Sequence, residues 1–185
     1  MQQRYVRINT VMNDGYKIFR DAVRETADGW LADGLPSRQV LEESAARLRN
    51  FRKQMQIQGL WEKPPCMVTA TLDDGLGQGL EIIEKFADAI GMRLVCLGLL
   101  QPAAAVVDAC LDEEPDFLGM TILHFDTEEE LTTIAAQLPQ KTRIVAGGPA
   151  FTGDPDFADR TGTHYAAKNV AAFLRLMLSD AVDAH

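Results

Sequence analysis

The chain has 185 residues, a length that suggests one full α/β domain with an appendage or two small units. Of these residues 46% are hydrophobic and 24% are charged, which is ordinary for a globular protein. Its 27 acidic residues outnumber 18 basic ones and give a net charge of -9, which argues against nucleic acid as a partner because phosphate binding needs a basic surface. The three cysteines show no CxxC spacing, so a disulfide framework or a zinc knuckle is not expected.

The first part of the chain predicts two helices joined by a short link. The opening MQQRYVRINT is too polar for a signal peptide, and no apolar run is long enough to cross a bilayer, so we expect a cytoplasmic protein without membrane contact. Apolar residues at helical spacing predict a helix over residues 13–32, which Gly34 and Pro36 end. Ser37 is a suitable N-cap for a second helix, whose apolar stripe runs to Met55.

From Cys66 onward, predicted strands alternate with predicted helices. The expected strands span residues 66–72, 93–97, 116–122, 143–146 and 163–165. The expected helices span residues 79–90, 102–112, 127–138, where Thr127 and Glu130 form a capping box, 155–159, and the stretch after Asn169. Continuous apolar strands, each followed by a helix, indicate an α/β fold with a five-stranded parallel sheet of the flavodoxin or Rossmann-like type. Ligands in such folds lie beyond the carboxyl ends of the strands.

Three of the loops at those ends carry an ordered set of residues. Asp74-Gly75-Leu76-Gly77-Gln78-Gly79 follows the first strand, and its spacing matches neither the dinucleotide fingerprint nor a P-loop. Thr121-Ile122-Leu123 ends the third strand, and Gly147-Gly148 ends the fourth. In this order and spacing, over about residues 66–180, the set resembles the D-x-H-x-x-G, S-x-L and GG elements of the cobalamin (vitamin B12)-binding domain family. Leu76 stands where that family has His, and Thr121 where it has Ser.

The resemblance implies that residues 66–183 form a domain that binds cobalamin. The cofactor's nucleotide tail would pass between the sheet and its helices, beside small residues and the Thr121 hydroxyl. The implied cofactor-binding residues are Asp74, Gly75, Leu76, Gly79, Thr121, Leu123, His124, Gly147, Gly148, Pro149, Phe151 and Tyr165. Because no nucleophile–base set is visible, chemistry would belong to the cofactor and to partner enzymes. The implied role is that of a methyl carrier or a B12-responsive sensor.

The leucine at position 76 changes the expected metal chemistry. Leucine cannot ligate cobalt, so we expect the cofactor to bind without a lower His ligand from this loop. Asp74 would then cap the following helix instead of orienting an imidazole. His124 is the remaining ligand candidate, although an ordinary surface histidine is the interpretation that we favour. His164 is expected to pack or to contact the tail.

The helical segment, residues 1–62, has two helices where the caps of this family have about four. We therefore expect it to serve as a cap or as a dimerisation element, with a second copy or a partner protein supplying the rest. A methyltransferase or a regulatory protein is the expected partner. Two alternatives stay open: a heme-binding sensor on the same scaffold, with His124 as axial ligand, and a ligand-free interaction module.

Overall fold

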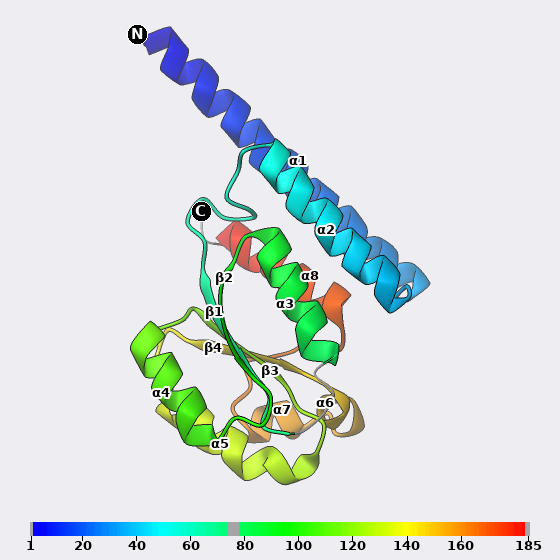
Figure 1. Ribbon diagram of the computed structural model, residues 1–185, viewed down its shortest axis with the longest axis vertical. Helices are drawn as coiled ribbons and strands as arrows, with labels where there is room; N and C mark the ends of the chain where they lie inside the picture. The colour runs from blue at the N-terminus through cyan, green and yellow to red at the C-terminus, as the bar shows by residue number, and fades with distance from the viewer. Residues whose placement is uncertain (1, 74–77, 184–185) are drawn as a thin grey trace. The chain divides into compact units, whose positions relative to one another are not determined.

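The structure is a computed structural model that describes residues 2–73 and 78–183, with side chains over residues 15–73 and 78–181 (Figure 1). Its contacts divide the chain into two compact units. Unit 1 comprises Met1–Pro64, Lys85–Met92 and Ala171–His185, and unit 2 comprises Pro65–Glu84 and Arg93–Val170. The division passes through two continuous helices, α3 (Gln78–Ile90) and α8 (Val170–Asp183), so each of them contributes residues to both units.

Unit 2 is built on a five-stranded sheet in the order β2-β1-β3-β4-β5, with every neighbouring pair parallel. The strands are β1 (Cys66–Ala70), β2 (Arg93–Gly98), β3 (Phe117–Thr121), β4 (Arg143–Gly147) and β5 (Tyr165–Ala166). The central strands β1 and β3 are buried almost throughout, whereas the edge strands β2 and β5 are partly exposed. Continuous apolar runs mark strands covered on both faces, and the predicted fold class is confirmed.

Short helices cover one face of this sheet (Figure 1). They are α4 (Ala103–Glu113), the 3-10 turn η1 (Phe125–Thr127), α5 (Glu128–Gln137), α6 (Pro149–Gly153) and α7 (Phe157–Arg160). Their apolar sides form one core with the strands, in which Val106, Leu118, Ile134, Ile144 and Phe157 are fully buried. The core fixes the strand ends, and therefore the loops that follow them, on a rigid base.

Two local expectations in unit 2 are wrong. Thr127 does not form the predicted capping box, because its hydroxyl donates to the His124 carbonyl oxygen (2.8 Å) within η1. Helix α6 was not predicted, since Gly147-Gly148 followed by proline is typical of a loop. Proline nevertheless suits the first position of a helix, where its fixed φ helps and its missing N–H costs nothing.

Unit 1 contains α1 (Gln2–Asp33) and α2 (Arg38–Gln54), together with the second half of α3 and nearly all of α8. The predicted end of α1 is confirmed: Gly34 has a φ of 90° and its N–H donates to the Trp30 carbonyl. Ser37 is the N-cap of α2, with its side chain accepting from the Val40 N–H. Helix α1 begins at Gln2, earlier than the predicted start at residue 13.

Aromatic contacts and ion pairs join the helices of unit 1. Trp30 of α1 meets Phe86 of α3 edge to face, with ring centroids 5.5 Å apart. Lys85 of α3 pairs with Glu42 of α2 (2.7 Å), and Arg175 of α8 pairs with Asp28 of α1. The two N-terminal helices thus pack on residues of α3 and α8 that lie more than 20 positions away along the chain.

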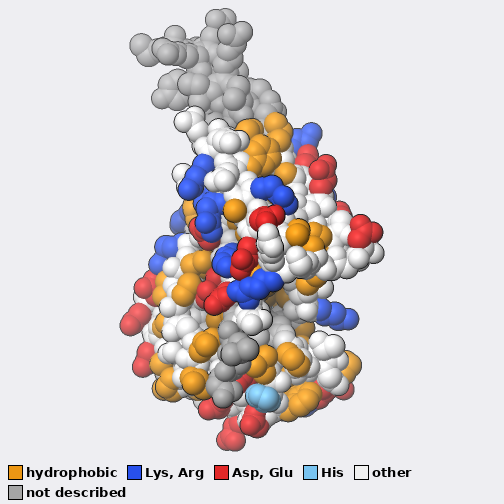
Figure 2. All heavy atoms as spheres, turned by 45° about the vertical axis from the view of Figure 1, so that its right-hand side comes forward, with side chains coloured by type: hydrophobic (Ala, Val, Ile, Leu, Met, Phe, Trp, Pro, Cys, Tyr) orange, Lys and Arg blue, Asp and Glu red, His pale blue; other side chains and the backbone are white. Residues whose placement is uncertain are grey.

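Figure 2 shows a face on which basic and acidic side chains alternate. The net charge of the chain is -9. Within the described residues, no helix is both long and apolar enough to span a membrane.

Candidate functional site

The loops that follow the strands of unit 2 are tied together by hydrogen bonds; we call this side of the sheet the carboxyl edge. The Asp73 carboxylate, after β1, accepts from the Leu123 N–H, after β3 (2.8 Å). The Ile122 N–H donates to the Gly147 carbonyl (2.8 Å), which links β3 to β4. The Thr71 N–H donates to the Gly98 carbonyl (3.1 Å), which links β1 to β2. These bonds fix the positions of the loops from which a ligand would be bound.

The two glycines at the carboxyl end of β4, its last residue Gly147 and the following Gly148, make room for neighbouring backbone. Gly148 has a φ of 116°, and a Cβ there would lie 2.3 Å from the Ile122 carbonyl oxygen. A Cβ on Gly147 would lie 2.5 Å from the Ala167 carbonyl oxygen. The fold therefore requires glycine at both positions, whatever binds nearby. Their predicted contact with a cofactor tail stays a prediction.

Gly79 and Thr121 face each other across a narrow gap. Gly79 lies in the first turn of α3, and Thr121 is the last residue of β3. A Cβ at Gly79 would lie 3.7 Å and 3.8 Å from the Thr121 Cγ2 and Oγ1 atoms, which is ordinary contact distance. The structure thus brings these two predicted residues together, with space for one added methyl group between them.

Several large apolar side chains on or after the strands of unit 2 are exposed. Leu99 and Leu100 follow β2, Phe125 follows β3, and Tyr165 lies in β5; all four are among the exposed large hydrophobic residues of the described chain. Leu100 is 61% exposed and has a φ of 54°, an uncommon backbone conformation for a leucine. An apolar side chain held toward solvent by strained backbone favours a binding surface.

Phe125 is held by an aromatic stack and by ion pairs behind it. Its ring meets Phe157 edge to face (5.7 Å between centroids), and Phe157 meets the buried Phe151 in the same way (5.1 Å). Arg160 donates to both carboxylate oxygens of Glu128 (2.9 and 3.0 Å) and to Asp154 (2.7 Å). These hydrogen bonds lower the pKa of the Glu128 and Asp154 carboxyl groups and raise that of Arg160.

The remaining predicted residues differ in exposure and in position. His124 is exposed just before η1, Pro149 is exposed at the start of α6, and Leu123 is half-buried after β3. Asp74, Gly75 and Leu76 lie outside the described residues. His164 packs rather than reaching the carboxyl edge: its Nδ1 accepts from the Ile144 N–H (3.1 Å), near the start of β4. In the described part of the chain no three His, Cys, Asp or Glu side chains are grouped as metal ligands.

The cysteines show no sign of activated thiols. Burial raises the pKa of the Cys110 thiol to about 12, and it also raises the pKa of Cys66. Cys96 is exposed on the edge strand β2, and its pKa is raised as well, mainly by desolvation. A thiol with a raised pKa is a poor nucleophile near neutral pH, so these residues do not indicate catalysis.

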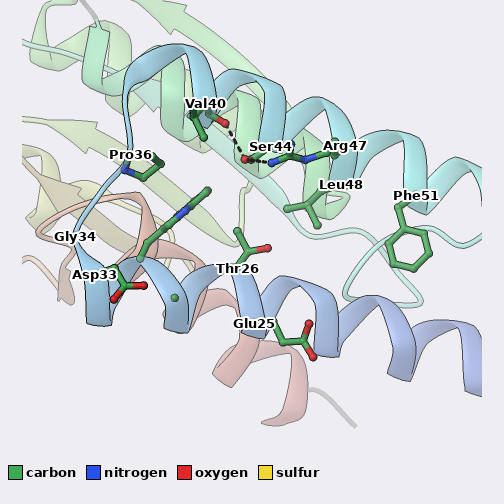
Figure 3. A pocket seen from close by; sticks show the side chains of 12 residues that line it. Glu25, Thr26, Asp33, Gly34, Pro36, Val40, Ser44, Arg47, Leu48 and Phe51 are labelled. Carbon is green, nitrogen blue, oxygen red and sulfur yellow. Dashed lines mark hydrogen bonds between the residues drawn. The ribbon is translucent and has the colours of Figure 1, made fainter.

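A separate groove of about 650 Å³ lies between α1 and α2 in unit 1 (Figure 3). Trp30, Leu48 and Phe51 supply apolar lining, while Glu25 and Arg47 supply charge. Ser44 accepts from Arg47 (2.7 Å) and donates to the Val40 carbonyl (2.7 Å). Two of the polar residues that line the groove, Ser44 and Arg47, are thus already paired with each other.

Sequence reasoning missed Asp73, Phe125, Leu99 and Leu100. Asp73 was detectable as the first of two acidic residues after a buried strand, and Phe125 as the aromatic residue next to His124. The position of Asp73 depends on its burial, and that of Phe125 on its packing against Phe157 of α7. The sequence pattern reveals neither of these.

Comparisons with known proteins agree on one family. Residues 66–173 match the family model described as the B12 binding domain. The fold is similar to a cobalamin-binding protein from Desulfitobacterium hafniense, with a TM-score of 0.74 at 16% identity over 95% of this chain and 90% of that one. It is also similar to the monomethylamine corrinoid protein of Methanosarcina barkeri, with a TM-score of 0.57 at 14% identity over 91% of this chain and 99% of that one.

A third similar structure is the methanol:cobalamin methyltransferase complex of Methanosarcina barkeri, with a TM-score of 0.62 at 19% identity over 91% of this chain and 68% of the matched chain. No curated protein matches the sequence significantly. None of the three structure names mentions heme, so the comparisons give the heme alternative no support.

Proposed function

Because the chain belongs to the B12 binding domain family over residues 66–173, we propose that it binds a corrinoid at the carboxyl edge and carries it for a methyltransferase. The observation that carries this proposal is the family match itself, which spans all five strands of unit 2 and the loops after them. The carrier role is supported by two neighbours whose names describe a corrinoid protein and a cobalamin methyltransferase complex.

The residues of the carboxyl edge fit the chemistry of a corrinoid. Such a molecule has a broad apolar macrocycle with amide groups around it and, in cobalamin, a nucleotide tail. Leu99, Leu100 and Phe125 offer exposed apolar contact area for a macrocycle. The gap between Gly79 and Thr121 offers space beside the sheet, and a Cβ added at position 79 would occupy that space. When bound, the corrinoid supplies the methyl-transfer chemistry through its cobalt.

We further propose that no histidine of the loop after β1 ligates the cobalt, because Leu76 occupies the family's His position. The protein then holds the corrinoid through contacts with the macrocycle and the tail. His124 stays a candidate ligand, supported by its exposed position directly after the Thr121 element. A His124→Ala variant whose bound cob(II)alamin keeps the electron paramagnetic resonance spectrum of the unmodified protein would rule that role out.

The test of corrinoid binding is direct. Purified protein is mixed with hydroxocobalamin, and separately with cob(II)alamin and methylcobalamin, and is then passed through a gel-filtration column. We expect a coloured protein peak containing about one corrinoid per chain. A protein that emerges colourless with all three forms would show that the proposal is wrong. The protein loaded with methylcobalamin is then mixed with a thiol and a methyltransferase. Transfer of the methyl group to the thiol is expected of a carrier and not of a sensor.

We propose that the helical segment, residues 1–62, acts as a cap or as a contact between two copies. Its support is a group of exposed apolar side chains on α1, on the following link and on α2, namely Leu31, Leu35 and Val40. Sedimentation velocity of the full chain and of a Leu31→Asp variant tests the second role. A monomer at every concentration would exclude a homodimer.

A further inference from the structure

Asp73 is buried, yet only one of its two carboxylate oxygens has a hydrogen-bond partner among the described residues. It is 8% exposed, and its Oδ2 accepts from the Leu123 N–H at 2.8 Å. Its main-chain carbonyl accepts from the Thr71 hydroxyl at 2.8 Å, which fixes the residue from the other side. Its Oδ1, however, is shielded from solvent and has no hydrogen-bond partner within the described part of the chain.

A buried carboxylate oxygen without a donor is unfavourable, since an ionised carboxylate can only accept hydrogen bonds and loses those of water on burial. Asp116 provides a comparison at the opposite end of β1. Its Oδ2 accepts from the Cys66 N–H at 2.7 Å, but it is only half-buried. A carboxylate thus accepts a hydrogen bond at each end of β1, and the one at the carboxyl edge has a buried oxygen without a partner among the described residues.

We propose that Asp73 Oδ1 accepts a hydrogen bond from an N–H or O–H group of the bound corrinoid; this rests on the proposed function. Both kinds of donor occur in cobalamin, as the amides of the macrocycle and the ribose hydroxyl of the tail. A metal ion is a poorer match, because Asp73 belongs to no group of three or more His, Cys, Asp or Glu side chains among the described residues. Because Leu123 and Thr71 already fix the residue, the free oxygen is preorganised for its donor.

The test is Asp73→Asn, which keeps the size of the side chain. The amide oxygen can still accept from the Leu123 N–H, while the amide nitrogen replaces the free acceptor with a donor. We expect the ligand-free protein to unfold at the same or a higher denaturant midpoint, because an unsatisfied buried charge is removed. We expect the Kd for hydroxocobalamin to rise about tenfold or more, since a hydrogen bond to a charged group is lost.

Asp116→Asn is the matched control, because it makes the same exchange at the far end of β1. It should leave the Kd for hydroxocobalamin unchanged. Cobinamide, which lacks the nucleotide tail, separates the two possible donors. A weaker Kd of D73N for both ligands assigns the donor to the macrocycle, and a weaker Kd for cobalamin alone assigns it to the tail.

Asp73→Ala covers the case in which D73N is itself destabilised. This variant loses the Leu123 contact and should unfold earlier without ligand, and it should also gain less stability from added hydroxocobalamin than the unmodified protein. If the unmodified protein binds corrinoid and both variants keep its Kd, the role of Asp73 is wrong and the proposed function stands. If the unmodified protein binds no corrinoid, both proposals are wrong.

Discussion

At the residue scale, a substitution at Gly79 should change the stability of the protein and its affinity for cobalamin in opposite directions. Gly79 lies in the first turn of α3, so Gly79→Ala should stabilise the ligand-free protein by about 0.5–1 kcal/mol through helix propensity. The new Cβ would lie at ordinary contact distance from Thr121 and would not clash. It would, however, fill space proposed for the cofactor, so we expect the Kd for cobalamin to rise about tenfold. Thermal unfolding and a spectroscopic titration measure the two effects.

Gly29→Ala is the control for this substitution. Gly29 lies inside α1, and a Cβ there meets nothing within 4 Å. It should therefore show the gain in stability without any change in the Kd. A G79A protein that binds cobalamin as tightly as the unmodified protein would place the cofactor away from the gap between α3 and β3.

The predictability of the site differs from residue to residue. Gly79 and Thr121 could be predicted to lie on the same side of the sheet, because Gly79 begins the helix after one parallel strand, Thr121 ends another, and both match ordered elements of one family. Asp73 could not, since its burial and its bond to Leu123 arise from the crossing of two loops that are 50 positions apart. Phe125 depends in the same way on Phe157, which orients its ring.

At the scale of elements, strands with a continuous apolar run were the easiest to predict. Strand β1 (Cys66–Ala70) is fully buried and has no competing helical pattern. The 3-10 turn η1 was missed because its geometry depends on the Thr127 hydroxyl, which donates to His124 rather than capping α5. Local hydrogen-bond choices of this kind are made by single hydroxyl groups, so residue composition does not determine them.

Arg160 should link three helices in a pH-dependent way. It pairs α7 with Glu128 of α5 and with Asp154 after α6. Because the folded protein lowers the pKa of both carboxyl groups, their contribution is complete above the pKa of the unfolded chain, about pH 4, and is lost as the pH falls through the folded pKa. Arg160→Met should therefore lower the thermal midpoint slightly at pH 7, and the difference should vanish in acid.

The exposed pair Arg93–Glu113 (2.8 Å) provides the control for Arg160. Arg93→Met removes one ion pair instead of two and should change the midpoint less at pH 7. High salt should shrink the effect of R160M because all three groups are solvent-accessible. A difference between R160M and the unmodified protein that persists below pH 3 would mean that lost packing on Phe157, and not charge, causes it.

At the scale of the whole molecule, contacts between residues divide the chain into units that differ from those that its composition suggests. The Pro64-Pro65 link suggests a boundary between a helical segment and an α/β domain. The contacts instead assign the second half of α3 and nearly all of α8 to the same unit as α1 and α2. Periodicity identifies an amphipathic helix, but it does not identify the element that its apolar face contacts, so this division could not be predicted.

The continuous helix α3, whose two halves belong to different units, leads us to expect cooperative unfolding, because breaking a helix in its middle forfeits its propagation energy. The chain has two tryptophans, Trp30 and Trp61, and both belong to unit 1. Their fluorescence therefore reports on unit 1, whereas far-ultraviolet circular dichroism reports on both units. We expect guanidinium unfolding to give the same midpoint with both probes.

A substitution in unit 2 tests directly whether the two units unfold together. Ile134 of α5 is fully buried in the core of unit 2, and Ile134→Ala should cost about 2–5 kcal/mol. If the units unfold together, the tryptophan midpoint of unit 1 falls as far as the circular-dichroism midpoint, although neither tryptophan belongs to the unit that was changed. A tryptophan midpoint that stays in place while circular dichroism shows an earlier transition would mean that α3 breaks at the boundary and that each unit unfolds alone.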